Sequence, residues 1–412
     1  MQLDDVTRAW ASSGGMWLTG HPNGAPLLLD GPFIERLTTA AAQVEHYGGV
    51  PIDLHAVISG RACAYGLVRQ GRVSANGTCR LLRARDGWFA LNLARDTDLE
   101  AIPALFCATA DSVADPIGDS DSPWELIEDL ARNTSAAAIV GQARLLGIPA
   151  SVLGEAAFGP SDPAPLPWRV VRHGARGVST TPVVIDFSAL WAGPLCASLL
   201  GRAGANVIKV ESMHRPDPMR SGPRSFYDSL HSGHDLATFD FSDARDLARL
   251  RELVASADIV IEASRPRALK QLGLEPEHFL AGGAGRTWIS ITGYGRTGPR
   301  AGHVALGDDA AISGGLVAYD QHTEPVFCAD AIADPLTGIN AAAVALQSMA
   351  EGGGCLIDIS MSSVAAYHAG PRTGPGHMAT VGRCPDGGND EWNLALASGD
   401  VRVARPSVPL VA

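Results

Sequence analysis

The sequence predicts an α/β fold built around a doubly wound parallel sheet, with a smaller α+β domain beside it. Two observations carry this prediction. Short apolar runs at 183–187, 206–211, 258–262 and 287–292 are typical of strands buried on both faces of a parallel sheet. Helical stretches separate these runs, and the alternation indicates a sheet that binds its ligand at the carboxyl ends of the strands.

The elements follow one another in a regular order from residue 182 onward. The run VVIDF at 183–187 predicts the first strand, and Pro194 suits the opening turn of a helix that ends at Gly204. The second strand is predicted at 206–211. A helical stretch at 244–256 leads into the strand at 258–262, and another strand follows at 287–292. We expect this unit to be the main domain.

Composition and charge narrow the class of protein. The chain has 412 residues, of which 46% are hydrophobic and 18% charged, and this predicts a soluble globular protein of two or three domains. A formal net charge of −12 argues against nucleic acid as a partner. No apolar run is long enough to cross a bilayer and the N-terminus is acidic, so we expect neither a membrane span nor a signal peptide.

The seven cysteines are odd in number, and no two of them have Cys-x-x-Cys spacing. This pattern predicts neither a disulfide framework nor a metal site. It is typical of a protein that works in the reducing cytoplasm.

The sequence repeats part of itself at an offset of about 300 residues. Ser-Gly-Gly stands at 13–15 and again at 313–315, and an apolar helical stretch follows each copy. The repeat predicts that the chain opens with a partial copy of the second half of its main domain. The predicted division is a partial copy at 1–61, a small α+β domain at 62–160, a Pro-rich linker at 161–180, the main α/β domain at 181–370 and an irregular tail at 371–412.

Several motifs in the main domain resemble those of the family III CoA-transferases, a family that includes α-methylacyl-CoA racemases and carnitine-CoA-type transferases. The matching blocks stand in the family's order across about 190 residues. The segments DGWFALNL and LLGIPASV resemble that family's small domain. The blocks are IDF at 185–187, AGP at 192–194, GANVIKVE at 204–211, ADIVIEASRP at 257–266, ITGYGRTGP at 291–299 and ADPLTG at 333–338.

The resemblance implies a Rossmann-like main domain and an interlocked homodimer. It also implies an acyl-CoA thioester and a carboxylic acid acceptor as the two substrates, with no tightly bound cofactor. In the family the large domain precedes the small one, whereas here the small domain comes before the intact large unit. The order is that of a two-copy ancestor that has lost the front of its first copy, or of a dimer in which each chain completes the other.

Asp334 is the residue that the resemblance assigns to catalysis. In the family, the aspartate at this position attacks the donor thioester, forms an acyl-aspartyl anhydride and then becomes an aspartyl-CoA thioester. A carboxylate is a competent nucleophile at neutral pH without a separate base. Gly314 and Gly315 are candidates for backbone donors to the oxyanion. The alternative is that Asp334 only caps the helix that follows it.

The resemblance also assigns residues that bind coenzyme A, and two of the family's basic positions differ here. Ser212 stands where the family often has an Arg, with Arg215 as the nearest substitute, and Gln271 replaces a later basic residue. The alternatives are a plain β-α connection for the loop and surface solvation for the arginines. The residues assigned to CoA are Ser188, Ala189, Leu190, Trp191 and Ala192 in the loop after the first strand, together with Arg265 and Arg267.

Three functions remain open from the sequence. The leading one is an acyl-CoA:carboxylate CoA-transferase. The second is an acyl-CoA racemase or isomerase, in which Asp334 works with His303 or Asp308, although the family's Gly-His-Asp segment reads Gly-Asp-Asp here. The third is a non-catalytic CoA-binding subunit, and the altered basic positions favour it.

Overall fold

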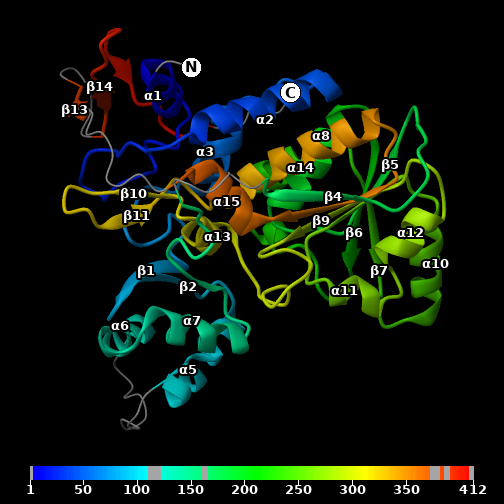
Figure 1. Ribbon diagram of the computed structural model, residues 1–412, viewed down its shortest axis with the longest axis horizontal. Coiled ribbons are helices and arrows are strands. Elements are labelled where there is room, and N and C mark those ends of the chain that lie inside the picture. The colour runs from blue at the N-terminus through cyan, green and yellow to red at the C-terminus, as the bar shows by residue number, and fades with distance from the viewer. Residues whose placement is uncertain (1–2, 110–121, 160–165, 372–380, 385–389, 408–412) are drawn as a thin grey trace.

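A seven-stranded sheet forms the centre of the molecule (Figure 1). The computed structural model describes residues 3–109, 122–159, 166–371, 381–384 and 390–407. The strand order is β4-β12-β9-β8-β5-β6-β7, and only β4 runs antiparallel to its neighbour. These strands are β4 (Trp168–Arg172), β5 (Val183–Asp186), β6 (Asn206–Ser212), β7 (Asp235–Phe239), β8 (Ile259–Glu262), β9 (Thr287–Thr292) and β12 (Cys355–Ser360).

The sheet is doubly wound. From β5 the chain moves outward to β6 and β7, and it then returns to place β8 on the other side of β5. The switch point between β5 and β8 therefore opens at the carboxyl ends of these strands, where ligands bind in such sheets. The predicted α/β sheet is confirmed, and each predicted strand appears within one residue of its expected bounds.

Helices cover both faces of the sheet, as Figure 1 shows. Alternate strand residues point to opposite sides: Val184 and Ile259 join the core beneath α8 and α14, while Ile185 and Val260 join the core with α10 and α12. The helices of this unit are α8 (Ala192–Arg202), α9 (Arg224–His231), α10 (Ala244–Ala255), α11 (Arg267–Gln271), α12 (Pro276–Ala281), α13 (Gly307–Gly314), α14 (Ala333–Ala350) and α15 (Met361–Ala369), with a short 3-10 helix at Pro218–Ser221.

A smaller unit contains a three-stranded antiparallel sheet, β1-β2-β3. Its core is separate from that of the main sheet, and Phe89 and Leu91 lie at its centre. Ser151 ties this unit to α13, because its hydroxyl donates to the Asp309 carbonyl at 2.7 Å. The elements are β1 (Cys79–Ala84), β2 (Gly87–Asn92), α4 (Asp96–Glu100), α5 (Ile102–Thr109), α6 (Pro123–Asn133), α7 (Ala136–Leu145) and β3 (Ala150–Val152).

The N-terminal segment packs onto the main unit rather than standing apart from it. Its helices are α1 (Leu3–Ser12), α2 (Phe33–Gly48) and α3 (Leu54–Tyr65). α2 lies against α14, its counterpart in the sequence repeat, and residues of both helices belong to one hydrophobic core. The Phe33 carbonyl also meets the buried His368 ring of α15.

The stretches predicted as a linker and as an irregular tail both contain strands. β4 lies in the predicted 161–180 linker and pairs with β12, although residues 161–165 fall outside the described part. In the predicted tail, β13 (Val381–Arg383), β14 (Trp392–Leu394) and β15 (Val401–Arg402) form a small sheet. The remaining strands, β10 (Val317–Tyr319) and β11 (Pro325–Phe327), form a hairpin. Strands of two or three residues are too short to produce a readable alternation.

No helix in the described ranges is both long and apolar enough to span a membrane. Within the same residues, no group of three or more His, Cys, Asp or Glu side chains has an arrangement that could hold a metal ion. The described cysteines Cys63, Cys79, Cys196, Cys328, Cys355 and Cys384 are free thiols.

Close packing of α8 against α14 makes a first prediction. A Cβ atom at Gly338 would lie 2.7 Å from the Ala192 carbonyl oxygen and 2.9 Å from the Leu195 side chain. Because a backbone atom cannot move aside easily, we expect Gly338→Ala to lower the free energy of unfolding by about 1–3 kcal/mol.

The matched control is Gly141→Ala on α7, where no atom lies within 4 Å of the added carbon. There the same substitution should stabilise the helix by up to about 1 kcal/mol, because alanine loses less backbone entropy on folding. Urea denaturation of both variants provides the comparison. Equal stability of the two would show that α8 and α14 are not in such close contact.

Candidate active site

The loop between β5 and α8 contains four of the five residues predicted to contact coenzyme A, the fifth, Ala192, being the first residue of α8. The backbone of this loop is held in a definite shape. The Ser188 N–H donates to Asp186 Oδ1 at 2.8 Å, and the Leu190 N–H donates to Asp217 Oδ1 at 3.1 Å. Leu190 has a φ of 69°, a left-handed conformation that costs a residue with a side chain about 1–2 kcal/mol. Contacts with Asp217 therefore help to keep the loop in a conformation that it would not adopt alone.

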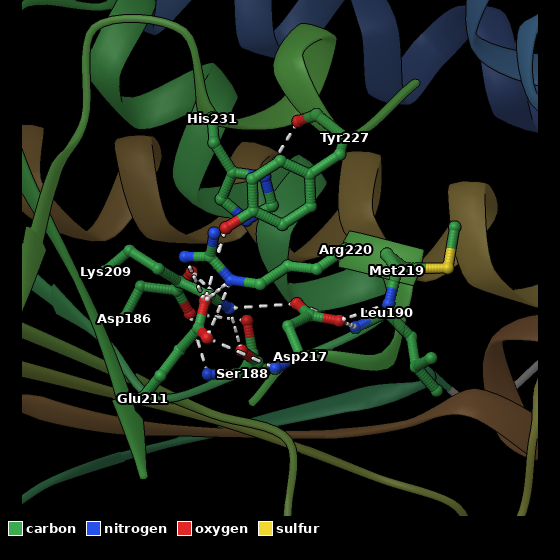
Figure 2. A network of polar contacts seen from close by, with 10 residues as sticks. All are labelled: Asp186, Ser188, Leu190, Lys209, Glu211, Asp217, Met219, Arg220, Tyr227 and His231. Carbon is green, nitrogen blue, oxygen red and sulfur yellow. Dashed lines mark hydrogen bonds and ion pairs between the residues drawn. The ribbon is translucent and has the colours of Figure 1, made fainter. Parts of the chain in front are cut away.

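A buried lysine fixes this loop through the Ser188 backbone and two carboxylates, as Figure 2 shows. The Lys209 ammonium donates to the Ser188 carbonyl, and it lies 3.3 Å from Asp217 Oδ2 and 3.6 Å from Asp186 Oδ2. The side chains of Lys209, Asp186 and Asp217 are all 0% exposed. Removing one partner from a buried ion pair typically costs about 3–5 kcal/mol, so these three residues form one unit.

The network continues into the segment after β6. Glu211 accepts hydrogen bonds from Arg220 Nε at 2.9 Å and from the Tyr227 hydroxyl at 3.2 Å. Burial alone would raise the pKa of Glu211, but the hydrogen bonds from Arg220 and from the Asp217 N–H lower it. The Tyr227 ring stacks on His231 at 4.1 Å. This part of the network borders a cavity of about 430 Å³ lined by Arg220, Arg224, Tyr227, Asp228, His231, Ser232 and Leu236.

Arginines gather at the carboxyl ends of β6 and β8. Burial lowers the pKa of Arg265, and the positive charges of Arg267, Arg95 and Arg215 lower it further. Arg215, Arg265 and Arg267 are exposed, and none of them has an ion-pair partner among the described residues. Arg95 comes from the small unit and is bound to Asp98. The two predicted phosphate-binding arginines thus lie in one cluster with Arg215, the substitute for the basic residue missing at Ser212.

Asp334 lies in the first turn of α14, which begins one residue earlier at Ala333. It is partly exposed, and its carboxylate accepts a hydrogen bond from the Gly307 N–H. The residue at the helix cap is Ile332, which makes no side-chain cap hydrogen bond. Since Asp334 is not the cap residue, the cap interpretation does not account for its presence. A Cβ atom at position 307 would lie 2.4 Å from Asp334 Oδ2, so the approach requires glycine.

Two more carboxyl groups and one guanidinium surround Asp334. Burial raises the pKa of Asp334 to about 7; the negative charges of Asp308 and Asp330 raise it too, and Arg61 opposes them. Burial likewise raises the pKa of Asp308 to about 7 and raises that of Asp330. Arg61 Nη1 contacts Asp330 Oδ1 at 2.6 Å. We call Arg61, Asp308, Asp330 and Asp334 the acidic cluster.

The chain just before Asp334 adopts an unusual backbone. Ala329 and Ala331 have φ angles of 52° and 42°, both in the left-handed region. Two hydrogen bonds hold this segment: the Ala329 N–H donates to the Thr19 hydroxyl at 2.9 Å, and the Ala331 N–H donates to Asp308 Oδ1 at 3.1 Å. Strain of this kind persists only where the surroundings enforce it, and it is common at functional sites.

The neighbouring Asp309 makes a second buried carboxyl site. Asn92 Nδ2 donates to Asp309 Oδ1 at 3.3 Å, and the Leu306 N–H donates to the same oxygen at 3.0 Å. Asp309 Oδ2 and Asn92 Oδ1 are both buried, with no hydrogen-bond partner within the described chain. Burial raises the pKa of Asp309 to about 8. Because burial disfavours the charged form, the Asp309 carboxyl should keep its proton at neutral pH.

His303, the alternative proton carrier, belongs to another group of side chains. Its ring lies 6.0 Å from that of Tyr294, and burial lowers its pKa, as do the charges of Arg144 and Arg300. His303 is not among the groups that shift the pKa of Asp334. Gly314, proposed above as an oxyanion donor, packs tightly against α15, and Gly307 takes the place beside Asp334.

The family model for CoA-transferase family III matches residues 182–398, which is more than half of the chain. The chain therefore belongs to the CoA-transferase family III.

Curated relatives of this chain are CoA-transferases by name. It is 32% identical over 191 residues to succinyl-CoA--D-citramalate CoA-transferase of Chloroflexus aurantiacus, covering 43% of this chain and 48% of that one. It is also 32% identical over 195 residues to mouse succinyl-CoA:glutarate CoA-transferase, covering 44% of each. A CAIB/BAIF family protein from Brucella suis is similar in structure with a TM-score of 0.41 and 28% identity, over 48% of this chain and 55% of that one. The chain thus spans about half the length of its relatives.

The sequence did not predict that Arg61, Gly307 and Asp330 lie around Asp334. Arg61 lies more than 250 residues away in the sequence, and no motif joins the two positions. Gly307 opens the Gly-Asp-Asp segment compared with the family motif, but nothing in the sequence indicates that its N–H meets Asp334. Asp330 did carry a signal, because it is a charged residue in the otherwise apolar stretch VFCADAIA, and buried charges are rare without a partner.

The pKa of Asp309 predicts how stability depends on pH. Because the folded pKa is raised to about 8, the folded state holds a proton that the unfolded chain releases near its ordinary pKa of about 4. This group therefore costs stability progressively as pH rises through that window, and the loss is complete above pH 8. Asp309→Asn should remove the loss, so its unfolding free energy relative to wild type should increase from pH 5 to pH 8.

Urea denaturation at several pH values measures this difference. Asp129→Asn, at an exposed aspartate on α6, controls for the loss of one negative charge. If Asp309→Asn changed the free energy of unfolding by the same amount at pH 5 and at pH 9, the raised pKa of Asp309 in the folded protein would be contradicted.

Proposed function

We propose that this chain is an acyl-CoA:carboxylate CoA-transferase in which Asp334 is the nucleophile. The proposal rests on the position of this carboxylate and on its contacts. Asp334 is partly exposed at the start of α14, accepts the Gly307 N–H, and lies one helical turn from Gly338, which touches the carbonyl of Ala192 in the predicted CoA loop. A reactive carboxylate beside the ligand-binding edge of a doubly wound sheet is what the transfer requires.

The proposed chemistry consists of carboxylate and thiolate attacks in turn. A carboxylate oxygen of Asp334 attacks the thioester carbonyl, the C–S bond breaks, and CoA leaves as the thiolate. The thiolate attacks the aspartyl carbonyl of the resulting anhydride and releases the donor acid, which leaves an aspartyl-CoA thioester. The acceptor carboxylate attacks this thioester and expels CoA again. CoA then attacks the acceptor's acyl carbon and restores the Asp334 carboxylate.

The arginine cluster supports binding of the CoA phosphates. Arg215, Arg265 and Arg267 are exposed and carry no ion pair among the residues described, although the chain as a whole has a net charge of −12. Guanidinium groups bind phosphate oxygens in pairs of parallel hydrogen bonds. The predicted pantetheine contacts then fall on the loop at 188–192, whose shape Lys209 fixes.

The predicted division at 1–61, 62–160, 161–180, 181–370 and 371–412 belongs to this proposal, as does the homodimer. The relatives are about twice as long as the part that matches. A second copy of this chain could supply what one copy lacks, and the substrate pocket would then lie between the main sheet and the small unit.

A second candidate function rests on Asp308. Its carboxyl has a pKa raised to about 7 by burial, and it acts electrostatically on Asp334. Two carboxyls with pKa values near neutrality can exchange a proton with a carbon acid held between them. This arrangement favours removal and return of the α-proton of an acyl-CoA.

Trapping tests the transferase proposal. The protein is incubated with succinyl-CoA, the donor in the names of the two relatives above, and then with hydroxylamine or borohydride. We expect peptide mass spectrometry to find the modification on Asp334. Asp334→Asn should lose the label and lower kcat by on the order of 10³-fold or more, because the nucleophile is gone. Asp320→Asn, at an aspartate bound to His21, is the matched control.

The outcomes separate the candidates. An unmodified Asp334 in protein that binds CoA would contradict the transferase mechanism and leave the CoA-binding subunit. Incorporation of deuterium at the acyl α-carbon in D2O, lost in Asp308→Asn, would instead favour the second candidate.

A further inference from the structure

Arg61 is the one member of the acidic cluster that comes from the N-terminal segment. It lies on α3, and its side chain is only 12% exposed. Its guanidinium is 5.3 Å from the Tyr65 ring and 5.6 Å from the ring of Trp191, one of the residues predicted to contact CoA. Nη1 contacts Asp330 Oδ1 at 2.6 Å. One positive charge thus lies beside the candidate CoA loop and acts electrostatically on the candidate nucleophile.

The charges that act on Asp334 come from three elements. They are Arg61 from α3, Asp308 from α13 and Asp330 from the segment before α14. Arg61 is the single cation acting on this carboxyl within the described residues. At the edges of the group, Asp308 raises the pKa of Asp309, and Tyr65 acts on Arg61. With all three carboxyls ionised, the cluster would carry an uncompensated net charge of −2.

The excess of negative charge means that Asp334 needs Arg61 in order to ionise. A carboxyl close to two others in a buried site loses its proton only with help from a positive charge or hydrogen bonds. The Gly307 N–H supplies one hydrogen bond to Asp334, and Arg61 supplies the charge. Asp330 Oδ2 is buried without a hydrogen-bond partner in the part of the chain described, so Asp330 serves mainly to hold the guanidinium.

We propose that Arg61 is a positioning residue for the reaction at Asp334: it maintains Asp334 as the carboxylate, and Asp330 anchors it between Asp334 and Trp191. The inference rests on the proposed function of Asp334. It also gives the N-terminal segment a role, since the partial copy of the main domain provides a residue that the intact copy needs. α3 is integrated with the main unit through Tyr65, whose hydroxyl lies 3.8 Å from Met219 Sδ.

Charge-changing variants at two positions test this inference by the direction of their effects. Arg61→Gln removes the positive charge and should shift the ionisation of Asp334 to higher pH by about 1 to 3 units. Asp330→Asn removes a negative charge and frees the guanidinium, so it should shift the ionisation to lower pH. Arg61→Lys keeps the charge and should fall between wild type and Arg61→Gln. A purely structural role would lower activity in all three without opposite shifts.

Two readouts follow the ionisation of Asp334. The first is the acid limb of kcat/KM against pH for succinyl-CoA-dependent transfer. The second needs no activity: carbodiimide coupling of Asp334 at a series of pH values, measured by peptide mass spectrometry and normalised to the exposed Glu100. If transfer is absent but the coupling midpoints shift in opposite directions, the proposed function fails and the role of Arg61 stands.

The contrary result is equally definite. Midpoints that stay within 0.3 units of wild type in folded Asp330→Asn and Arg61→Gln protein, or that shift the same way in these two variants, would overturn the inference. Should Arg61→Gln fail to fold by circular dichroism, Arg61→Lys is compared with Asp330→Asn instead, and an Arg61→Lys midpoint that is not above that of wild type would overturn the inference.

Discussion

One buried guanidinium shared among three carboxyl groups is the constraint on which this site depends. Arg61 touches Asp330, acts on Asp308 and Asp334, and borders the Trp191 ring, so the acidic cluster and the loop at 188–192 meet at a single charge. Burying that many acids is costly unless some stay protonated. Burial accordingly raises the pKa values of Asp308 and Asp334 to about 7, and this would set the pH range for the nucleophilic role proposed for Asp334.

A second buried charge performs a comparable task for the loop at 188–192. Lys209 lies between Asp186 and Asp217 and binds the Ser188 carbonyl, while Asp217 holds the Leu190 N–H. The strand β6 that carries Lys209 therefore determines the shape of the loop that follows β5. Lys209 thus acts on the backbone that follows β5, at the edge of the sheet where doubly wound folds bind their ligands.

Local pattern was enough to predict the sheet but not the surroundings of Asp334. The strands at 183–187, 206–211, 258–262 and 287–292 were readable because each is a short apolar run between helical stretches. β4 and β7 were missed, since β4 follows a Pro-rich stretch and β7 is half exposed at the edge of the sheet. Arg61 and Gly307 could not be predicted, because their importance comes from contacts between segments distant in the sequence.

A crystal structure of the protein with bound succinyl-CoA tests the account most directly. The account predicts the CoA phosphates within hydrogen-bond reach of Arg215, Arg265 and Arg267, the pantetheine chain along the loop at 188–192, and the thioester carbon about 3–3.5 Å from an Asp334 oxygen. Phosphates bound away from these arginines, or a thioester remote from Asp334 with CoA fully ordered, would contradict it.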